Sequence, residues 1–330
     1  MTHLAPAPAF SVPLETVPDA LRGAVVAIGN FDGVHRGHQA VLERARQMAA
    51  AAGVPAVALT FEPHPRSLFR PDQPIFRLTP PPLKARLLKA VGLDGLITAR
   101  FDHAFAGLSA QAFVDTVLGD RLGARHVLIG WDFHFGKARA GTPAFLAEAG
   151  PAAGFTVDIT APLADDTGGA ISSSRVRDAL AAGDVATANA LLGWRWRVTA
   201  SVRHGDKRGR ELGFPTANMR LPDDCALAHG IYAVRVETGG RRVDGVASFG
   251  RRPTFDNGAP LLEVFLFDFS GDLYGRDLTV TLVEYLRPEW RFASIDGLID
   301  QIARDCEKAR HCLAQAAPVS PLDAMLDAPA

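Results

Sequence analysis

The stretch AVVAIGNFDGVHRGH, residues 24–38, decides how the first half of the chain folds. It begins with the apolar run AVVAIG, which is typical of a short strand buried on both faces. After the loop NFDGVHRG, apolar residues recur with the spacing of one helical face from Val41 to Ala52, and Gly53 is a suitable C-terminal stop. The stretch therefore predicts a strand, a loop and a helix in succession.

The same alternation continues beyond this helix. Apolar runs at 56–61, 96–99 and 126–130 predict three further strands. A helix is expected at 83–91, with Thr79 and Pro80 as its cap and first-turn residue, and another is expected to open at Ser109. Strands that alternate with helices predict a mostly parallel sheet covered on both faces, which is an α/β fold. Ligands of such sheets bind at the carboxyl ends of the strands, so the loop Asn30–His38 is the expected site.

The second half changes period near Trp194. The segments RWRVTASV, GIYAVRVETG, RVDGVASFG, LLEVFLFDF and DLTVTLVEYL alternate with a period of two, which predicts antiparallel strands that close into a small barrel. Apolar residues with helical spacing predict a final helix from Ile295 to about Leu313. We therefore expect two domains, 1–188 and 189–330.

Length, charge and cysteine content exclude several classes of protein. A chain of 330 residues exceeds the usual size of one hydrophobic core. Its 35 basic and 36 acidic residues leave a net charge of −1, which argues against a general nucleic-acid or membrane-surface binder. We find no secretion signal and no apolar run long enough to cross a membrane. Three sparse cysteines without CxxC spacing favour the reducing cytoplasm, and we expect a monomer or a weak homo-oligomer.

Two motifs in the first half suggest phosphate binding. In HRGH, residues 35–38, two imidazoles flank Gly37 where a helix begins, an arrangement suited to a polyphosphate from which pyrophosphate departs. The pair could instead bind a metal ion, or cap and pack the helix. In ISSSRVR, residues 171–177, hydroxyls and two arginines form a second candidate phosphate clamp, although a serine run alone is often only a helix cap. Its candidate residues are Ser172, Ser173, Arg175 and Arg177.

The second half carries a candidate nucleotide site of its own. In HGDKRGRELGFPTAN, residues 204–218, glycines and cations can surround a phosphate. Thr216 and Asn218 offer oxygen ligands for Mg²⁺ shared with ATP. The alternative is a turn with solvated charges. The candidate phosphate-binding residues are Gly205, Lys207 and Gly213.

Glu263 is the candidate general base of the second half. In LLEVFLFDF it shares one strand face with Phe265 and Phe267, where a carboxylate is costly unless it serves a function. The alternative is an ion pair with Arg251 or Arg252.

The motifs together resemble one family along almost the whole chain. GNFDGVHRGH, FEPHP, GWDFHFGKARAG and ISSSRVR, over residues 24–177, look like the adenylyltransferase half of prokaryotic bifunctional riboflavin kinase/FAD synthetases. GRELGFPTAN, GIYAV, SFGRRPTF, LEVFLFDF and DLYG, from about 194 to 312, resemble the riboflavin kinase half of the same family. The resemblance implies a Rossmann-like nucleotidyltransferase domain followed by a riboflavin kinase barrel with a C-terminal helix.

The resemblance also implies roles for particular residues. Thr216 and Asn218 would bind MgATP, and Glu263 would activate the 5′-hydroxyl of riboflavin. The residues that would bind ATP in the first half are Asn30, Phe31, His35, Gly37, His38, Ser172, Ser173, Arg175 and Arg177, and those near FMN are Phe61, His64 and Asp132. The sequence departs from the family pattern at Ser174 for Thr, at Ser248 and Phe249 for Asn-Ile, and at Phe265, where His is frequent.

We therefore expect one polypeptide with two ATP- and Mg²⁺-dependent activities, phosphorylation of riboflavin to FMN and adenylylation of FMN to FAD. HxGH also occurs in class I aminoacyl-tRNA synthetases, but the KMSK-type loop and the basic tRNA surface of that class are missing. Two alternatives stay open: a non-catalytic flavin-binding protein, and a nucleotidyltransferase for another small phosphate.

Overall fold

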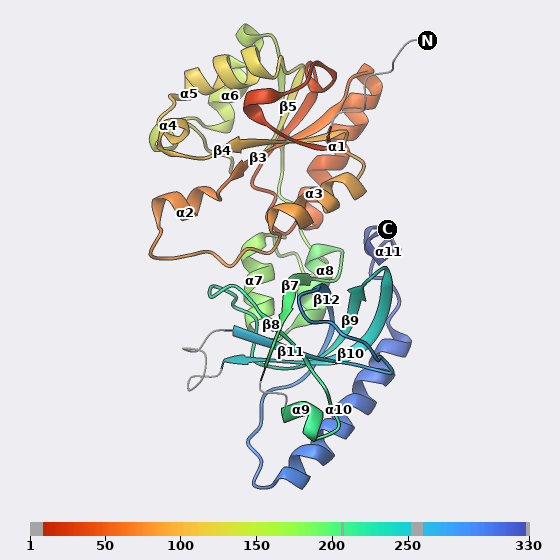
Figure 1. Ribbon diagram of the computed structural model, residues 1–330. Coiled ribbons are helices and arrows are strands. Elements are labelled where there is room, and N and C mark those ends of the chain that lie inside the picture. The colour runs from red at the N-terminus through yellow and green to blue at the C-terminus, as the bar shows by residue number, and fades with distance from the viewer. Residues whose placement is uncertain (1–8, 206–207, 252–259, 328–330) are drawn as a thin grey trace, which may run out of the picture. The chain divides into compact units, whose positions relative to one another are not determined.

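The computed structural model describes residues 9–205, 208–251 and 260–327 (Figure 1). The chain divides into two compact units, Met1–Ser172 and Ser173–Ala330. Each unit has its own sheet and is described by itself. Among the described residues, no helix is both long enough and apolar enough to cross a membrane.

The first unit is built on a parallel six-stranded sheet with the order β1-β4-β3-β2-β5-β6. The four strands expected from the sequence are all present, and the parallel α/β fold is confirmed. Two short strands at the sheet edges were not predicted. The strands are β1 Ser11–Pro13, β2 Val25–Ile28, β3 Ala56–Glu62, β4 Gly95–Arg100, β5 His126–Gly130 and β6 Thr156–Thr160.

Helices cover the sheet of the first unit because successive strand residues point to opposite faces. One face packs in a large apolar core with the π-helical segment Phe113–Arg121, and Phe61 belongs to that core. Thr60 and Glu62, on either side of Phe61, point to the other face. The helices of this unit are α1 Arg36–Ala52, α2 Pro65–Phe69, α3 Pro81–Ala90, α4 His103–Ala106, α5 Ala110–Ala112 and α6 Pro143–Ala149.

Two expected helix starts have different outcomes. Ser109 caps α5 as predicted, since its hydroxyl accepts the Ala112 N–H at 3.0 Å. The prediction that Thr79 caps α3 was wrong, because α3 begins at Pro81 after Pro80 with no side-chain cap. The Thr79 hydroxyl instead accepts the Gly33 N–H at 2.9 Å, a long-range partner that the local pattern could not indicate.

The second unit is a closed antiparallel barrel with the strand order β10-β11-β8-β7-β12-β9. The predicted barrel and its C-terminal helix are confirmed, and β8 is a strand that was not predicted. The strands are β7 Arg197–Arg203, β8 Ala217–Arg220, β9 Gly230–Thr238, β10 Arg241–Arg251, β11 Pro260–Leu266 and β12 Asp277–Arg287; the helices are α7 Ser173–Ala181, α8 Val185–Leu192, α9 Arg208–Glu211, α10 Ile295–Gln315 and α11 Pro321–Asp327.

The helices α7 and α8 belong to the compact barrel unit, whereas the predicted domain boundary lies at residue 188. Asn189 explains why α8 goes with the barrel. It is 3% exposed, its Nδ2 donates to the Leu282 carbonyl of β12 at 3.2 Å, and its Oδ1 accepts the Trp196 N–H at 2.9 Å. The compact units therefore divide at 172/173, while the functional boundary at 188 stays a prediction.

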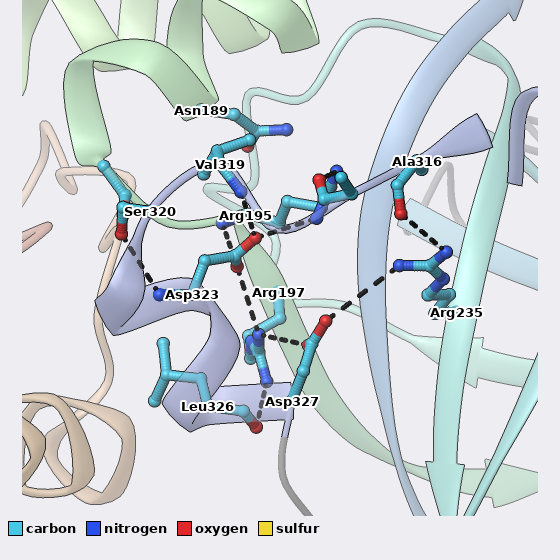
Figure 2. Close-up of polar contacts among 12 residues, drawn as sticks. Asn189, Arg195, Arg197, Arg235, Ala316, Val319, Ser320, Asp323, Leu326 and Asp327 are labelled. Carbon is cyan, nitrogen blue, oxygen red and sulfur yellow. Dashed lines mark hydrogen bonds and ion pairs between the residues drawn. The ribbon is translucent and has the colours of Figure 1, made fainter.

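A buried ion-pair network fastens the short helix α11 to the barrel (Figure 2). The Asp323 carboxylate accepts the Arg195 N–H at 2.9 Å and the Arg195 Nη1 at 2.8 Å, and it also accepts the Val319 N–H at 3.0 Å. Arg197 donates to the Leu326 carbonyl at 3.3 Å. Asp323 is fully buried, so its negative charge and its oxygen lone pairs need these partners.

We expect Asp323→Asn to destabilise the barrel by about 3 kcal/mol, because breaking a buried pair leaves an uncompensated charge. Urea unfolding followed by tryptophan fluorescence, to which the buried Trp194 and Trp196 contribute, measures the loss. Asp300→Asn on the exposed side of α10 is the control and should change stability by less than about 0.5 kcal/mol. Equal stability of the two variants would contradict the role of the network.

Candidate functional sites

The loop after β2 adopts an unusual backbone conformation that brings two histidines together. Phe31, Gly33 and Val34 all have positive φ, at 48°, 90° and 38°. Only glycine tolerates this region readily, so the two non-glycine residues need external support. Fully buried strand residues lie before the loop, and α1 follows it at Arg36. The loop thus sits at the carboxyl end of a central strand, where the sequence analysis expected it.

His35 and His38 lie one above the other at the start of α1. Their ring centroids are 3.6 Å apart with an interplanar angle of 17°, and the His38 ring meets Phe31 edge-on at 5.3 Å. His35 Nδ1 accepts the His38 N–H at 3.3 Å, so His35 does cap the helix. No acidic residue lies in the first turn of α1 to oppose an anion. Among the described residues, no group of three or more His, Cys, Asp or Glu side chains could hold a metal ion.

Two polar atoms at this loop are buried and lack a hydrogen-bond partner in the described structure. They are Asn30 Oδ1 and His38 Nδ1. Burying such atoms without a partner is costly, so they mark places where a ligand group could bind. Glycine at position 37 allows the backbone to lie close to its neighbours. A Cβ there would lie 3.2 Å from the His35 ring and 3.5 Å from the Ile171 carbonyl.

That contact with Ile171 brings the start of ISSSRVR beside the histidine loop. Ser172 is the last residue of the first compact unit. Ser173, Arg175 and Arg177 stand on α7 in the second unit, and all four side chains are half-buried. The motif is therefore continuous in sequence but is divided between the two units.

Burial lowers the pKa of His38 well below the ordinary histidine value, and the nearby His35 and Lys84 lower it further. His38 is therefore neutral at pH 7. In the unfolded chain its pKa is about 6.5. As pH falls through this value, the unfolded state takes up a proton that the folded state does not, and stability decreases.

His38→Gln should remove this pH-dependent contribution. The stability of the wild type relative to the variant is expected to fall between about pH 7.5 and about pH 5.5. Hydrogen exchange of the β2 amides reports the stability of the first unit by itself. A difference between the two proteins that does not change with pH would contradict the lowered pKa.

The three residues expected near FMN occupy different surroundings in the first unit. Phe61 is 7% exposed and packs edge-on against Phe101 at 5.9 Å. His64 caps α2, since its Nδ1 accepts the Arg66 N–H at 3.1 Å. Asp132 is exposed after β5. All three follow or end strands β3 and β5 at their carboxyl ends.

The second unit contains a cavity of about 280 Å³ whose lining includes two of the candidate kinase residues, Thr216 and Glu263. Glu263 on β11 lies opposite Asn218 of β8 and Ser248 of β10 in the strand register. Asn218 Nδ2 donates to the Thr216 carbonyl at 3.2 Å, which orients the amide. The cavity lining includes Thr216, Ser248, Glu263, Phe265, Arg287 and Asp305.

The glycine-rich segment before β8 is described in part. A Cβ on Gly205 would lie 2.7 Å from the Asn218 side chain, so glycine permits this close approach. Gly213 has φ of 86°, which favours glycine for conformational reasons. Lys207 lies outside the described residues, as does Arg252, one of the alternative ion-pair partners of Glu263. Nη2 of Arg251, the other alternative partner, donates to the Asp223 carbonyl at 3.0 Å.

The departures from the family pattern fall in two environments. Ser248 and Phe265 line the cavity, where Phe265 also contacts the Phe214 ring at 5.5 Å. Phe249 is fully buried and meets the His229 ring edge-on at 5.6 Å.

An arginine that the sequence analysis did not single out also lines the cavity. Arg287 forms a two-sided ion pair with Asp305 of α10, with Nη2 to Oδ2 at 2.6 Å and Nε to Oδ1 at 2.9 Å. Its guanidinium lies 4.6 Å above the Trp290 ring. The only sequence signal was the cation–aromatic cluster LRPEWRF at the end of β12, which carries no information about the distant Asp305.

A parallel sheet with an anion-suited helix N-terminus, joined to a barrel with a carboxylate facing hydroxyl and amide ligands, defines a two-unit phosphate-group transferase. Models of two protein families match the chain: FAD synthetase over residues 17–175 and riboflavin kinase over residues 192–313.

Curated relatives carry both units in one chain. The chain is 44% identical to the bifunctional riboflavin kinase/FMN adenylyltransferase of Pseudomonas fluorescens, over 90% of this chain and 95% of the relative. It is 43% identical to the enzyme of the same description from Escherichia coli K12, over 87% and 92%. The chain belongs to the bifunctional riboflavin kinase/FMN adenylyltransferase family, and the predicted pair of activities is confirmed.

A solved structure shares the overall fold. A Streptococcus pneumoniae protein described as a macrolide-efflux protein is 32% identical, with a TM-score of 0.82 over 92% of this chain and 99% of that one.

Proposed function

We propose that the barrel unit phosphorylates riboflavin to FMN and that the sheet unit adenylylates FMN to FAD. The observation that carries the division is the strand register of the barrel. It brings Glu263 opposite Asn218, and Glu263 and Thr216 line one cavity. The first unit contributes the stacked pair His35 and His38 at a helix N-terminus, where His38 Nδ1 and Asn30 Oδ1 are buried without a hydrogen-bond partner among the described residues.

In the kinase step Glu263 is the general base. Its carboxylate accepts the proton of the ribityl 5′-hydroxyl while that oxygen attacks the γ-phosphorus of ATP, and ADP leaves. Phe265 lines the cavity and would offer the flavin ring an apolar contact. The Phe265 and Ser248 departures therefore act on flavin affinity.

Mg²⁺ is a proposed cofactor of the barrel. The Thr216 hydroxyl and the Asn218 amide oxygen are hard ligands of the kind that Mg²⁺ prefers. The hydrogen bond from Asn218 Nδ2 to the Thr216 carbonyl occupies the amide nitrogen and leaves Oδ1 for a ligand. When bound, Mg²⁺ would neutralise charge on the ATP phosphates. Gly205, Lys207 and Gly213 would surround those phosphates.

In the adenylyl transfer a phosphate oxygen of FMN attacks the α-phosphorus of ATP, and pyrophosphate leaves. The amides at the start of α1 and the imidazoles of His35 and His38 would stabilise the charge that develops on the phosphates. Neutral His38 can donate one hydrogen bond without a change of protonation. The other proposed ATP contacts are Asn30, Phe31, Gly37, Ser172, Ser173, Arg175 and Arg177.

The flavin of FMN would lie near Phe61, His64 and Asp132. Phe61 is joined by Phe101 and Phe105, which provide an aromatic surface of the kind that flavin rings contact. The proposed location of the enzyme is the cytoplasm. Its three cysteines are free thiols, and burial raises the pKa of Cys225 and Cys306 to about 11, which makes them unreactive packing residues.

Glu263→Gln tests the kinase assignment. Loss of the base should lower the rate of FMN formation by at least about 100-fold. FAD formation from supplied FMN should be unchanged, because Glu263 is not among the proposed contacts of the adenylyl transfer. Glu284→Gln, at an exposed position of β12, is the matched control. Chromatography of the flavins measures both products, and equal loss of both activities would refute the assignment.

His38→Ala tests the adenylyltransferase assignment in the opposite direction. FAD formation should fall about 100-fold because a donor to the developing phosphate charge is lost. Phosphorylation of riboflavin should continue, and the exposed His103→Ala should behave as the wild type. If FAD forms at the wild-type rate, His38 has no catalytic role.

A further inference from the structure

Lys84 of α3 is buried beneath the histidine loop and appears in none of the motifs of the sequence. It is 1% exposed. Its Nζ donates to Thr60 Oγ1 at 3.2 Å and to Glu62 Oε1 at 2.8 Å. Burying an ammonium group costs desolvation free energy, so we expect Lys84 to have a role beyond packing.

One chain of hydrogen bonds leads from Lys84 to the beginning of the loop. Thr60 Oγ1, which accepts from Lys84, donates in turn to the Asn30 carbonyl at 3.1 Å. Because the hydroxyl has a single proton, the direction of this chain is determined: Lys84 donates to Thr60, and Thr60 donates to Asn30.

A second chain leads from Lys84 to the middle of the loop. Glu62 is held on both oxygens by Arg77, at 2.8 and 3.1 Å, and Arg77 Nε lies 3.7 Å from Asp32. The Asp32 carboxylate accepts the Leu78 N–H at 3.2 Å and the Thr79 N–H at 2.9 Å. Four buried or half-buried charges therefore alternate in sign from Lys84 to the loop.

The two chains end on either side of Phe31, one of the two non-glycine loop residues with positive φ. Strain of this kind persists only where the surroundings enforce it. The loop conformation in turn sets where the stacked imidazoles lie. Lys84 also acts on the site through space, since its charge contributes to the lowered pKa of His38.

We propose that Lys84 is a positioning residue for FMN adenylylation, holding Asn30 and Asp32 so that the histidine loop keeps the geometry that meets the ATP phosphates. The inference rests on the proposed function of the first unit. Without the ammonium, the chain of charges Glu62, Arg77 and Asp32 carries a net negative charge next to a loop that is proposed to bind a polyphosphate.

The surroundings of Lys84 allow a sharp set of substitutions. Lys84, Thr60 and Glu62 line a cavity of about 550 Å³ on the face of β3 opposite Phe61. An arginine at position 84 keeps the charge and the donors, whereas methionine keeps the length and removes both. Lys89, exposed on the same helix, provides the matched control.

The experiment measures both activities in each full-length variant. For Lys84→Met we expect kcat of FAD formation to fall at least about 10-fold, with KM for FMN changed less than about twofold and riboflavin phosphorylation unchanged. Lys84→Arg should recover most of kcat, and Lys89→Met should match the wild type. Wild-type kcat in Lys84→Met, or equal loss in Lys84→Arg and Lys84→Met, overturns the proposal.

If Lys84→Met does not fold, Thr60→Val tests the same hydrogen-bond chain. It removes one hydroxyl without adding charge and should lower kcat about threefold or more, and its effect should not add to that of Lys84→Met where both fold. An unchanged kcat in Thr60→Val then overturns the proposal. Failure of the proposed function can be told apart from failure of the Lys84 proposal, because in the first case the wild type and Lys89→Met would form no FAD at all.

Discussion

Each unit depends on a buried carboxylate that accepts backbone N–H groups from a segment far along the chain. In the sheet unit, Asp32 accepts from Leu78 and Thr79, which are 46 and 47 residues away. In the barrel unit, Asp323 accepts from Arg195 across 128 residues (Figure 2). A carboxylate with such partners cannot leave them without exposing a buried charge and several orphaned donors. Asp32 therefore holds the strained loop of the sheet unit in place, and Asp323 holds the short helix α11 against the barrel.

The alternation of side chains along β3 allows two requirements to be met by adjacent residues. Phe61 points into the aromatic core beside Phe101, while Thr60 and Glu62 point to the opposite face and meet Lys84. The residue proposed to lie near the flavin and the residues that contact Lys84 are thus consecutive in sequence but lie on opposite faces of the sheet. The barrel uses the same principle, because Glu263 faces the cavity while its neighbours Leu262 and Val264 are fully buried.

Local pattern predicted the elements whose burial is continuous along the sequence, such as the run before Gly29 and the period-two segment around Glu263. It could not predict β1 and β6, which are short and lie at the sheet edges, nor β8, whose four residues are held by pairing with β11 and β7. The motifs predicted most of the candidate site residues, since those residues lie close together in sequence. Thr79 was given the wrong role, and Lys84 and the Arg287–Asp305 pair were missed, because their partners come from other elements. Neither composition nor periodicity carries that information.

The motif ISSSRVR passes from one compact unit into the other between Ser172 and Ser173. A fragment cut where the units divide would be well packed on each side, yet it would leave the first hydroxyl with the sheet and both arginines with the barrel. If this motif binds ATP as proposed, the compact units and the adenylyltransferase require different fragments of the chain. The adenylyltransferase fragment would then extend through α7, although α7 belongs to the compact barrel unit.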